Sequence, residues 1–322
     1  MTTIGQDLKM AKNFLATGEL TAIPTETVYG LAGNALNPKS ISRIFEVKNR
    51  PRFNPLIIHT SSISKVYPLI NDFPDIFQKL TEVFWPGALT LIFDKSDKVS
   101  DMVTAGSPKV AVRIPDHPLT LKLLNNIDFP LAAPSANPFG YVSPTTAKHV
   151  NDQLGGEIPY ILDGGECKVG LESTIIGMYE GQPMILRKGG ISTEEIEMIV
   201  GPIKIKTSSD TNPDAPGMLT SHYSPVKPLI MGEMEEMLGL YSDKKIGVIS
   251  FAKDYPSNKT LILSPKGSFK EAAKKLFSTI RKLDDDKNID IILAERLPDQ
   301  NLGKTINDRL QRASCHLGKN KF

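Results

Sequence analysis

Short apolar runs alternate with amphipathic segments through the N-terminal part of the chain, and this alternation restricts the folds that the chain can adopt. The runs have the length and composition of strands: Leu20–Ile23, Leu56–His59, Leu89–Phe93, Val110–Ile114, Leu131–Ala133, Tyr160–Leu162, Ser173–Gly177 and Met184–Arg187. Segments with helical periodicity lie between them: Pro38–Val47, Ile63–Ile70, Asp75–Phe84, Pro118–Asn125 and Thr145–Leu154. Together they predict an α/β domain with a mixed sheet.

Two helices frame this domain. The first is predicted at the N-terminus and ends near Gly18, with one apolar face made of Ile4, Leu8, Ala11, Phe14 and Leu15. The last is Ser192–Val200, where Ser192 and Glu195 have the spacing of a capping box. We therefore predict that the first domain covers residues 1–205.

Residues 206–227 lose this periodicity and are rich in Ser, Thr, Pro and Asp, which predicts a linker. A second α/β pattern follows in residues 228–322. Its strands are predicted at Leu229–Met231, Ile246–Ser250, Thr260–Leu263 and Ile289–Ala294. Its helices are predicted near Glu233–Leu240, Ser268–Leu283 and Gly303–Ala313. This part is predicted to be a small doubly wound domain.

Composition excludes several classes of protein. The net charge of +2 does not indicate a nucleic-acid binder, so a basic surface would have to be local. Cys167 and Cys315 have neither CxxC nor zinc spacing, which argues against a disulfide framework. No signal peptide and no apolar run of membrane-spanning length is evident, so we expect a protein of the cytoplasm with no membrane contact.

Polar residues and cations gather at the ends of the predicted strands. A polar turn, PTET, follows the first run, and three cations lie in Lys48–Arg52. Lys48 and Arg50 could simply complement the C-terminal dipole of their helix, and the pair alone favours that interpretation about two to one. The Pro and Asn residues that follow fix the loop and favour a site. It is no P-loop, because GxxxxGK[ST] is absent.

The other candidate residues follow strands farther along the chain. Arg113 ends an apolar strand, where it could bind a carboxylate or phosphate or form an ion pair at the edge of the sheet. Leu131–Thr145 is a loop of small residues, hydroxyls and prolines, which suits a ligand but also a simple turn. GLESTIIG and ILRKGG add hydroxyls, cations and glycines before a helix N-terminus. No cluster of His, Asp and Glu predicts a metal site.

The motifs together resemble those of a known family. IPTETVYGLAGNA, KNRPRFNPLIIH, VAVRIP, APSANPFGYVSPT, ESTI, LRKGG and APGMLTSHYSP follow one another in the order found in the two-domain threonylcarbamoyl-AMP synthases. The resemblance implies a YrdC-like domain, with a twisted mixed sheet and a concave pocket, and a Rossmann-like accessory domain. It also implies condensation of L-threonine, bicarbonate and ATP to threonylcarbamoyl-AMP and pyrophosphate. A downstream enzyme would transfer the threonylcarbamoyl group to tRNA.

The resemblance also assigns roles to residues. The threonine site would comprise Thr27, His59, Arg113, Ser173 and the backbone of Ala133. The ATP site would comprise Lys48, Arg50, Asn54, Ser135, Asn137, Ser143, Arg187 and Tyr223. Lys48, Arg50 and Arg113 would be the catalytic residues, with Thr25, Tyr29 and His222 in secondary roles. Lys109 departs from the family pattern of a small hydroxyl residue, and would contact ATP through its backbone or its charge.

The expected chemistry requires alignment and charge neutralisation more than a protein acid or base. Mg²⁺ would arrive with the triphosphate. His222 and Tyr223 lie in the linker, so Thr207–Lys227 could fold over the pocket as a lid. Two alternatives stay open: a non-catalytic protein that binds double-stranded RNA, and a carbamoyl-transfer maturation factor. The near-neutral charge argues against the first and the two cysteines against the second.

Overall fold

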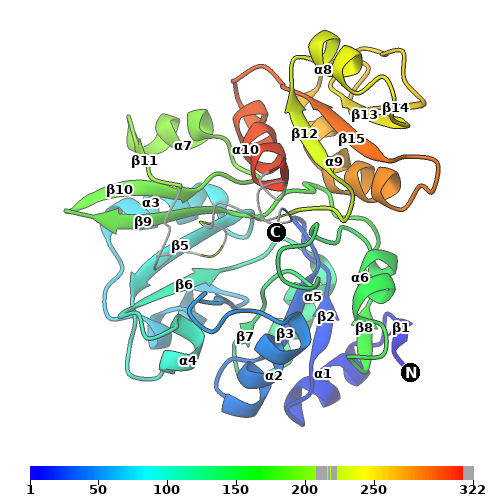
Figure 1. Ribbon diagram of the computed structural model, residues 1–322. Helices are drawn as coiled ribbons and strands as arrows, with labels where there is room; N and C mark the ends of the chain where they lie inside the picture. Colours follow the sequence, from blue (N-terminus) through cyan, green and yellow to red (C-terminus); the bar gives the residue numbers. More distant parts are fainter. Residues whose placement is uncertain (208–215, 217, 219–222, 315–322) are drawn as a thin grey trace. The chain divides into compact units, whose positions relative to one another are not determined.

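The computed structural model describes residues 1–207, 216, 218 and 223–314 (Figure 1). These residues form two compact units. The second unit contains the described residues from Tyr223 onward together with two short segments, Gly140–Val142 and Val169–Leu171, and the first unit contains the rest. No helix within the described ranges is long and apolar enough to cross a membrane.

The first unit is built on one eleven-stranded sheet with the order β1-β8-β2-β3-β7-β4-β6-β5-β9-β10-β11. Parallel and antiparallel pairs both occur in it, which confirms the mixed sheet. The strands are β1 (Thr3–Gly5), β2 (Thr21–Ile23), β3 (Gly30–Asn34), β4 (Ile57–His59), β5 (Leu89–Asp94), β6 (Lys109–Arg113), β7 (Leu131–Ala132), β8 (Tyr160–Leu162), β9 (Thr174–Tyr179), β10 (Gln182–Arg187) and β11 (Lys204–Ile205).

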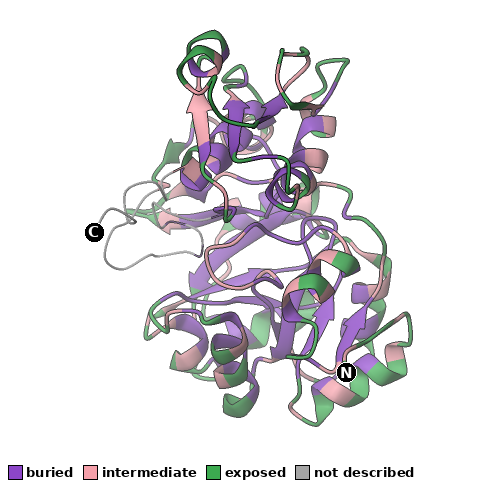
Figure 2. Ribbon diagram, turned by 45° about the vertical axis from the view of Figure 1, so that its right-hand side comes forward, coloured by how far each residue is buried: buried purple, intermediate pink, exposed green. Residues whose placement is uncertain are grey.

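The helices of this unit are α1 (Leu8–Ala16), α2 (Pro38–Lys48), α3 (Asp75–Phe84), α4 (Asp101–Thr104), α5 (Pro118–Asn125), α6 (Ala147–Leu154) and α7 (Thr193–Val200). Apolar residues of α2, α3, α6 and α7 form the main core on one face of the sheet. Those of α1 and α5 cover the other face beside β2, β3, β7 and β8. Figure 2 shows most strands as buried and the helices as partly exposed.

The second face has a different cover beside β4, β5, β6 and β9. There Ile57, Ile92, Ala111 and Ile175 pack with Met218, a described residue of the predicted linker, and not with a helix of the described chain. Alternation along the strands places these residues opposite the main core, because Ile58, Leu91 and Val112 belong to that core. Among the described residues, Met218 is thus the cover of this part of the sheet.

Three local predictions were wrong. Ile4 lies in β1 and is 44% exposed, because Asp7 accepts hydrogen bonds from the Lys9 and Met10 amides and starts α1 only at Leu8. Ile63–Ile70 forms two 3-10 turns, Ile63–Lys65 and Tyr67–Leu69, since Pro68 prevents a continuous α-helix.

The third error is an omission, because none of the predicted strands includes Gly30 to Gly33, and these residues lie in strand β3. Both glycines allow neighbouring side chains to approach the backbone of this strand closely. A Cβ on Gly33 would lie 2.9 Å from Leu20 Cδ2, and one on Gly30 would lie 3.2 Å from Ala133 Cβ. The predicted capping box is confirmed, since Ser192 and Glu195 bond reciprocally at the start of α7.

The second unit contains a parallel sheet with the order β12-β15-β13-β14. Its strands are β12 (Leu229–Gly232), β13 (Ile246–Ser250), β14 (Lys259–Ile262) and β15 (Ile291–Glu295), and its helices α8 (Met234–Leu240), α9 (Phe269–Asp284) and α10 (Leu302–Ser314). Met234 and Met237 of α8 pack on Ile246 and Val248. Gly247 faces the opposite side of this sheet, where a Cβ would lie 3.0 Å from Leu283 Cδ2 of α9. Helices therefore cover both faces of the sheet, which confirms the predicted doubly wound domain.

Candidate active site

A row of polar side chains crosses the sheet on the face that Met218 covers. His59 of β4 and Thr90 of β5 are both register partners of Arg113 on β6, and cross-strand partners point to the same side of a sheet. The next row toward the strand interior is apolar, with Ile57 and Ile92 flanking Ala111. Arg113 and His59 are only 4% and 3% exposed. The register of three strands thus brings these residues together.

Arg113 forms a buried ion pair with Glu26, a residue that the sequence interpretation passed over. Glu26 Oε1 lies 2.5 Å from Arg113 Nη2, and both side chains are 5% exposed. The backbone N–H of Asp116 donates to Glu26 Oε2 at 3.0 Å, and Arg113 Nε donates to the Gly87 carbonyl at 3.1 Å. The only signal for Glu26 in the sequence was an acid in the polar turn and a lone arginine at a strand end. Their pairing depends on tertiary structure.

The polar turn that carries Glu26 is closed by its own hydroxyls. Thr25 Oγ1 accepts from the N–H groups of Thr27 and Val28 at 3.2 Å, and lies 2.7 Å from Thr27 Oγ1. Both threonines are buried. Tyr29, which follows this turn, donates its hydroxyl to the Gly165 carbonyl at 2.7 Å and so links the turn to that loop.

His59 is held as a neutral imidazole. Burial, followed by the nearby Arg113 charge, lowers its pKa from 6.5 to about 3. Its Nδ1 lies 3.2 Å from the Ile57 carbonyl, which can only accept a hydrogen bond. Nδ1 therefore carries the proton and Nε2 presents a lone pair. This ring can accept a hydrogen bond from a ligand without adding positive charge.

Ser173 and Arg187 extend the row. Ser173 Oγ lies 2.7 Å from Thr90 Oγ1 and receives a hydrogen bond from Arg187 Nη2 at 2.9 Å. Arg187 also donates to the Ser173 carbonyl and, through Nη1, to the Pro216 carbonyl at 3.1 Å. Pro216 and Met218 belong to the segment predicted to be a lid, of which residues 207 and 223–227 are also described. Arg187 thus joins the threonine-site candidate Ser173 to that segment.

Lys48 is placed differently from a solvated helix cap. It is 1% exposed, and Nζ donates to the carbonyl oxygens of Ser135 and Asn137 at 2.5 Å each. Burial, followed by the Arg50 charge, keeps its pKa well below the usual value. The ammonium holds the loop after β7 in shape, so the interpretation of Lys48 as a solvated cap was wrong.

Arg50 is fixed by the loop that follows it. Its guanidinium donates to Asn54 Oδ1 at 2.7 Å and to the carbonyls of Asn54 and Pro55, and it lies 5.9 Å from the centre of the Phe139 ring. The Asn54 side chain is fully buried, and its Nδ2 has no hydrogen-bond partner in the described chain. A buried amide donor without a partner beside a guanidinium suits an anionic ligand.

The loop after β7 connects these groups. The Ala133 N–H donates to the Ile57 carbonyl at 3.0 Å, and Ser135 pairs with Gly30 across an isolated bridge. Ser143, farther along, donates to Glu172 Oε1 at 2.6 Å, and Glu172 directly precedes Ser173. The structure therefore links the predicted loops to one another through buried hydrogen bonds.

Three candidates remain to be placed: Lys109, Tyr223 and His222. Lys109 lies on the same sheet face as Arg113 but four residues away along β6, roughly 13 Å at the usual rise per residue. Its ammonium pairs with Asp94 at 2.6 Å, and both side chains are partly exposed. Tyr223 is buried in the second unit, 5.6 Å from the Phe277 ring and 4.9 Å from the Arg309 guanidinium. His222 lies outside the described residues.

Metal ligands are sparse in this arrangement. Across the described ranges, no group of three His, Cys, Asp or Glu side chains could hold a metal ion. The two buried carboxylates beside the candidate residues are already engaged, Glu26 by Arg113 and Glu172 by Ser143.

The fold and these side chains define a class of protein, an α/β enzyme that aligns small anionic substrates with buried cations and hydroxyls. Two family models match the chain: the one described as "Telomere recombination" covers residues 13–189, and "Threonylcarbamoyl-AMP synthase, C-terminal domain" covers residues 191–315. The chain belongs to the threonylcarbamoyl-AMP synthase family, in its two-domain form.

Curated relatives with the same name extend over nearly the whole chain. The threonylcarbamoyl-AMP synthase of Pyrococcus abyssi is 40% identical, covering 95% of this chain and 94% of the relative. That of Bacillus subtilis is 39% identical, covering 98% and 94%. Among solved structures, P. abyssi Sua5 complexed with L-threonine has a TM-score of 0.92 at 38% identity and covers 98% of both chains. Escherichia coli YciO, at 18% identity and TM-score 0.53, shares the fold of 59% of this chain.

Proposed function

We propose that the chain condenses L-threonine, bicarbonate and ATP to threonylcarbamoyl-AMP and pyrophosphate. The observation that carries the proposal is the buried row of His59, Arg113, Thr90 and Ser173, joined through the loop after β7 to Lys48, Arg50 and Asn54. Threonine as a substrate is supported by the P. abyssi structure, which holds it, and by the names of the relatives. ATP and bicarbonate follow from the name of the product and from the cations.

The proposed reaction has two steps. The threonine amine adds to bicarbonate and loses water to give a carbamate. A carbamate oxygen then attacks the α-phosphorus of ATP, and the bond to pyrophosphate breaks. Neither step requires a protein triad, and both require two anions to be held side by side. Buried cations on both sides of the site would neutralise their charge.

The side chains divide between the substrates. Arg113, oriented by Glu26, would bind the threonine carboxylate, while neutral His59 and the hydroxyls of Thr27 and Ser173 would accept and donate hydrogen bonds around it. Arg50 and the free Asn54 amide would bind phosphate oxygens, and Lys48 would keep Ser135 and Asn137 in place for the nucleotide. Arg187 and Ser143 are further candidates on the ATP side. Lys109 and Tyr223 complete the proposed ATP-binding residues.

Mg²⁺ is proposed to enter with ATP, and its role would be to neutralise charge on the triphosphate and the departing pyrophosphate. The product is a mixed anhydride that a downstream tRNA-modifying enzyme would consume in the cytoplasm.

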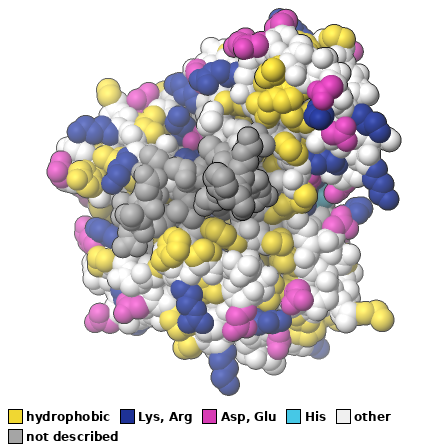
Figure 3. Space-filling model, in the orientation of Figure 1, with side chains coloured by type: hydrophobic (Ala, Val, Ile, Leu, Met, Phe, Trp, Pro, Cys, Tyr) yellow, Lys and Arg dark blue, Asp and Glu magenta, His cyan; other side chains and the backbone are white. Residues whose placement is uncertain are grey.

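The alternative of a non-catalytic RNA-binding protein has little support, since Lys and Arg side chains are scattered among Asp and Glu on the face shown in Figure 3. RNA contact by the chain is not needed for this reaction.

The reaction is tested by pyrophosphate release, with L-threonine and bicarbonate each omitted in turn. We expect release only when both are present. Pyrophosphate release that is unchanged by either omission would refute the proposed reaction.

Two substitutions test the division of roles between the substrates. Arg50→Ala should raise the KM for ATP, and Ser173→Ala should mainly raise the KM for threonine. Identical effects of the two substitutions on both KM values would contradict it.

A further inference from the structure

Helix α9 of the second unit ends in a carboxylate that binds two separate segments of chain. Asp284, the last residue of α9, accepts from the Tyr141 hydroxyl at 2.6 Å and from the Val226 N–H at 3.0 Å through Oδ2. Its Oδ1 accepts from the Lys227 N–H at 2.8 Å. Asp284 is only 9% exposed. One buried carboxylate therefore fixes both the segment Gly140–Val142 and the chain that enters β12.

Arg281, one turn earlier on α9, binds the same segment. Its guanidinium lies 5.1 Å from the centre of the Tyr141 ring and donates to the Val142 carbonyl. Burial, followed by the hydrogen bond to Asp284, raises the pKa of Tyr141, so its hydroxyl stays protonated and remains a donor. The Ser224 N–H adds a bond to the Gly140 carbonyl at 2.8 Å. Helix α9 and Ser224 thus bind every residue of Gly140–Val142.

A second loop, which contains Gly170, contacts the backbone of α9. Gly170 has φ +76°, and a Cβ there would lie 2.5 Å from the Lys274 carbonyl oxygen, so the loop touches the helix backbone. Gly170 lies two residues before Glu172, the residue whose carboxylate accepts from Ser143. Both chain segments that lead into this hydrogen bond are therefore anchored on α9.

We propose that Asp284 is a positioning residue for the nucleotide. Asp284 fixes the position of Tyr141 and Val142, and so determines the backbone position of the next residue, Ser143. Ser143 is a candidate for ATP binding. The inference rests on the proposed function for the identity of the ligand. It gives the second unit a role in the reaction although Asp284 itself is not placed among the groups that touch the substrates.

Asp284→Asn is the direct test, because the amide keeps the size of the side chain but loses one of the two accepting oxygens. Asp285→Asn is the matched control: Asp285 is the next residue, is exposed, and undergoes the same change of charge. We expect Asp284→Asn to raise the KM for ATP about ten-fold, the usual effect of losing one charged hydrogen bond, and to leave the KM for threonine within about two-fold. Asp285→Asn should resemble the unsubstituted chain.

A second readout does not depend on activity. In the full chain, the backbone amides of residues 140–143 should exchange with solvent faster in Asp284→Asn than in Asp285→Asn. Tyr141→Phe provides an independent variant, since it removes only the hydroxyl and keeps the ring under Arg281. It should raise both the exchange rate and the KM for ATP, even if Asp284→Asn does not fold.

The inference would be overturned by an unchanged KM for ATP in Tyr141→Phe together with unchanged exchange at residues 140–143, or by equal effects of Asp284→Asn and Asp285→Asn. A rise in the KM for threonine equal to that for ATP would also contradict it, because a general loss of structure affects both substrates. Failure of the proposed function would look different: pyrophosphate release by the unsubstituted chain would not depend on threonine, while the exchange experiment would still report on Asp284.

Discussion

At the scale of single residues, burial determines what each candidate side chain can do. Arg113 and Lys48 are cations with almost no exposure, and each is compensated, the first by the Glu26 carboxylate and the second by two carbonyl oxygens. A buried charge must be paired or bonded in this way. Arg113 therefore depends on a residue that the sequence did not single out, and Lys48 holds the loop after β7.

Lys48→Met tests the structural part of this role. The substitution leaves the carbonyls of Ser135 and Asn137 without their donor, so we expect the free energy of unfolding to fall by about 3 kcal/mol. Lys39→Met is the control, because Lys39 lies in the first turn of the same helix, is exposed, and should change stability by less than about 0.5 kcal/mol. Urea denaturation of both variants measures the difference. Equal stabilities would show that Lys48 does not hold the loop.

His59 predicts a pH dependence of stability. Its pKa is about 3 in the folded chain and 6.5 when unperturbed, so between these values the unfolded chain binds the proton more readily. The contribution of neutral His59 is complete above pH 6.5 and is lost as the pH falls toward 3, by up to ~1.4 kcal/mol per pH unit.

His59→Asn removes this titration while keeping an N–H near the Ile57 carbonyl. The free energy of unfolding of the unsubstituted chain should therefore fall more steeply between pH 6.5 and pH 4.5 than that of the variant. Denaturant unfolding at several pH values in this range measures both slopes. Parallel slopes would mean that the imidazole is accessible to protons in the folded chain.

At the scale of elements, the strands were predicted well where apolar residues ran together, and poorly where packing required small residues. β4, β6 and β9 were found within a residue or two of their bounds, whereas β3 was missed because Gly30 and Gly33 are needed for close contact. The candidate site shows the same limit. His59 and Arg113 lie at strand ends that periodicity reveals, but their adjacency, and the contribution of Thr90, depend on strand order, which no local pattern encodes.

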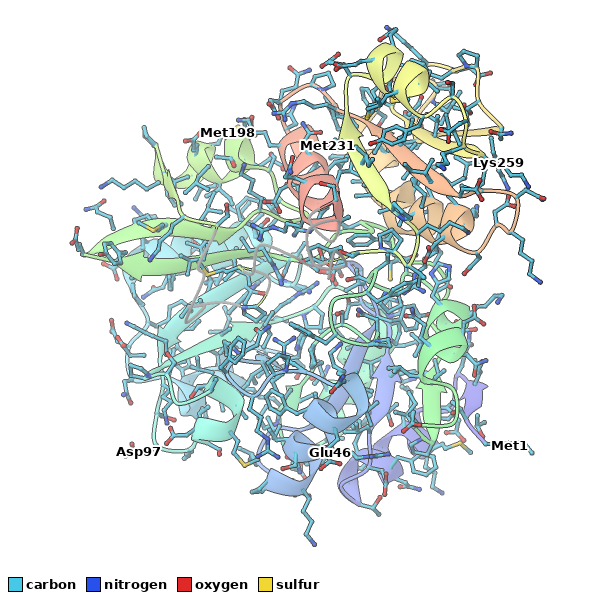
Figure 4. The ribbon with its side chains drawn as sticks, viewed as in Figure 1. Met1, Glu46, Asp97, Met198, Met231 and Lys259 are labelled. Carbon is cyan, nitrogen blue, oxygen red and sulfur yellow. The ribbon has the colours of Figure 1, made fainter. Side chains whose placement is uncertain are left out.

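The Met218→Ala substitution tests whether this residue of the predicted linker contributes to stability and activity. Its side chain is fully buried against Ile57, Ile92 and Ile175, so Met218→Ala should lower the free energy of unfolding by about 2 kcal/mol. Activity should fall as well, because the apolar row borders His59 and Arg113. Met198→Ala on α7 is the control, since Met198, labelled in Figure 4, is 76% exposed. If the two alanine variants behave alike, this contact does not contribute.

At the scale of the whole molecule, the chain belongs to the threonylcarbamoyl-AMP synthase family, and the sheet and the loops after its strands carry the side chains proposed to bind threonine and the nucleotide. Within the second unit, which the sequence predicted only as a doubly wound domain, Asp284 and Arg281 of α9 hold the segment Gly140–Val142. Local sequence patterns could not indicate this connection, because the residues involved are separated by more than a hundred positions along the chain.

The most direct test of the proposed reaction is the identity of the product. The chain should be incubated with ATP, L-threonine and bicarbonate labelled with ¹³C, and the nucleotides analysed by mass spectrometry. We predict an adenylate whose mass equals that of AMP joined to threonine through one carbonyl, with the ¹³C label in that carbonyl. An adenylate that contains threonine but no label, or the absence of any threonine-containing adenylate while pyrophosphate is released, would contradict the account.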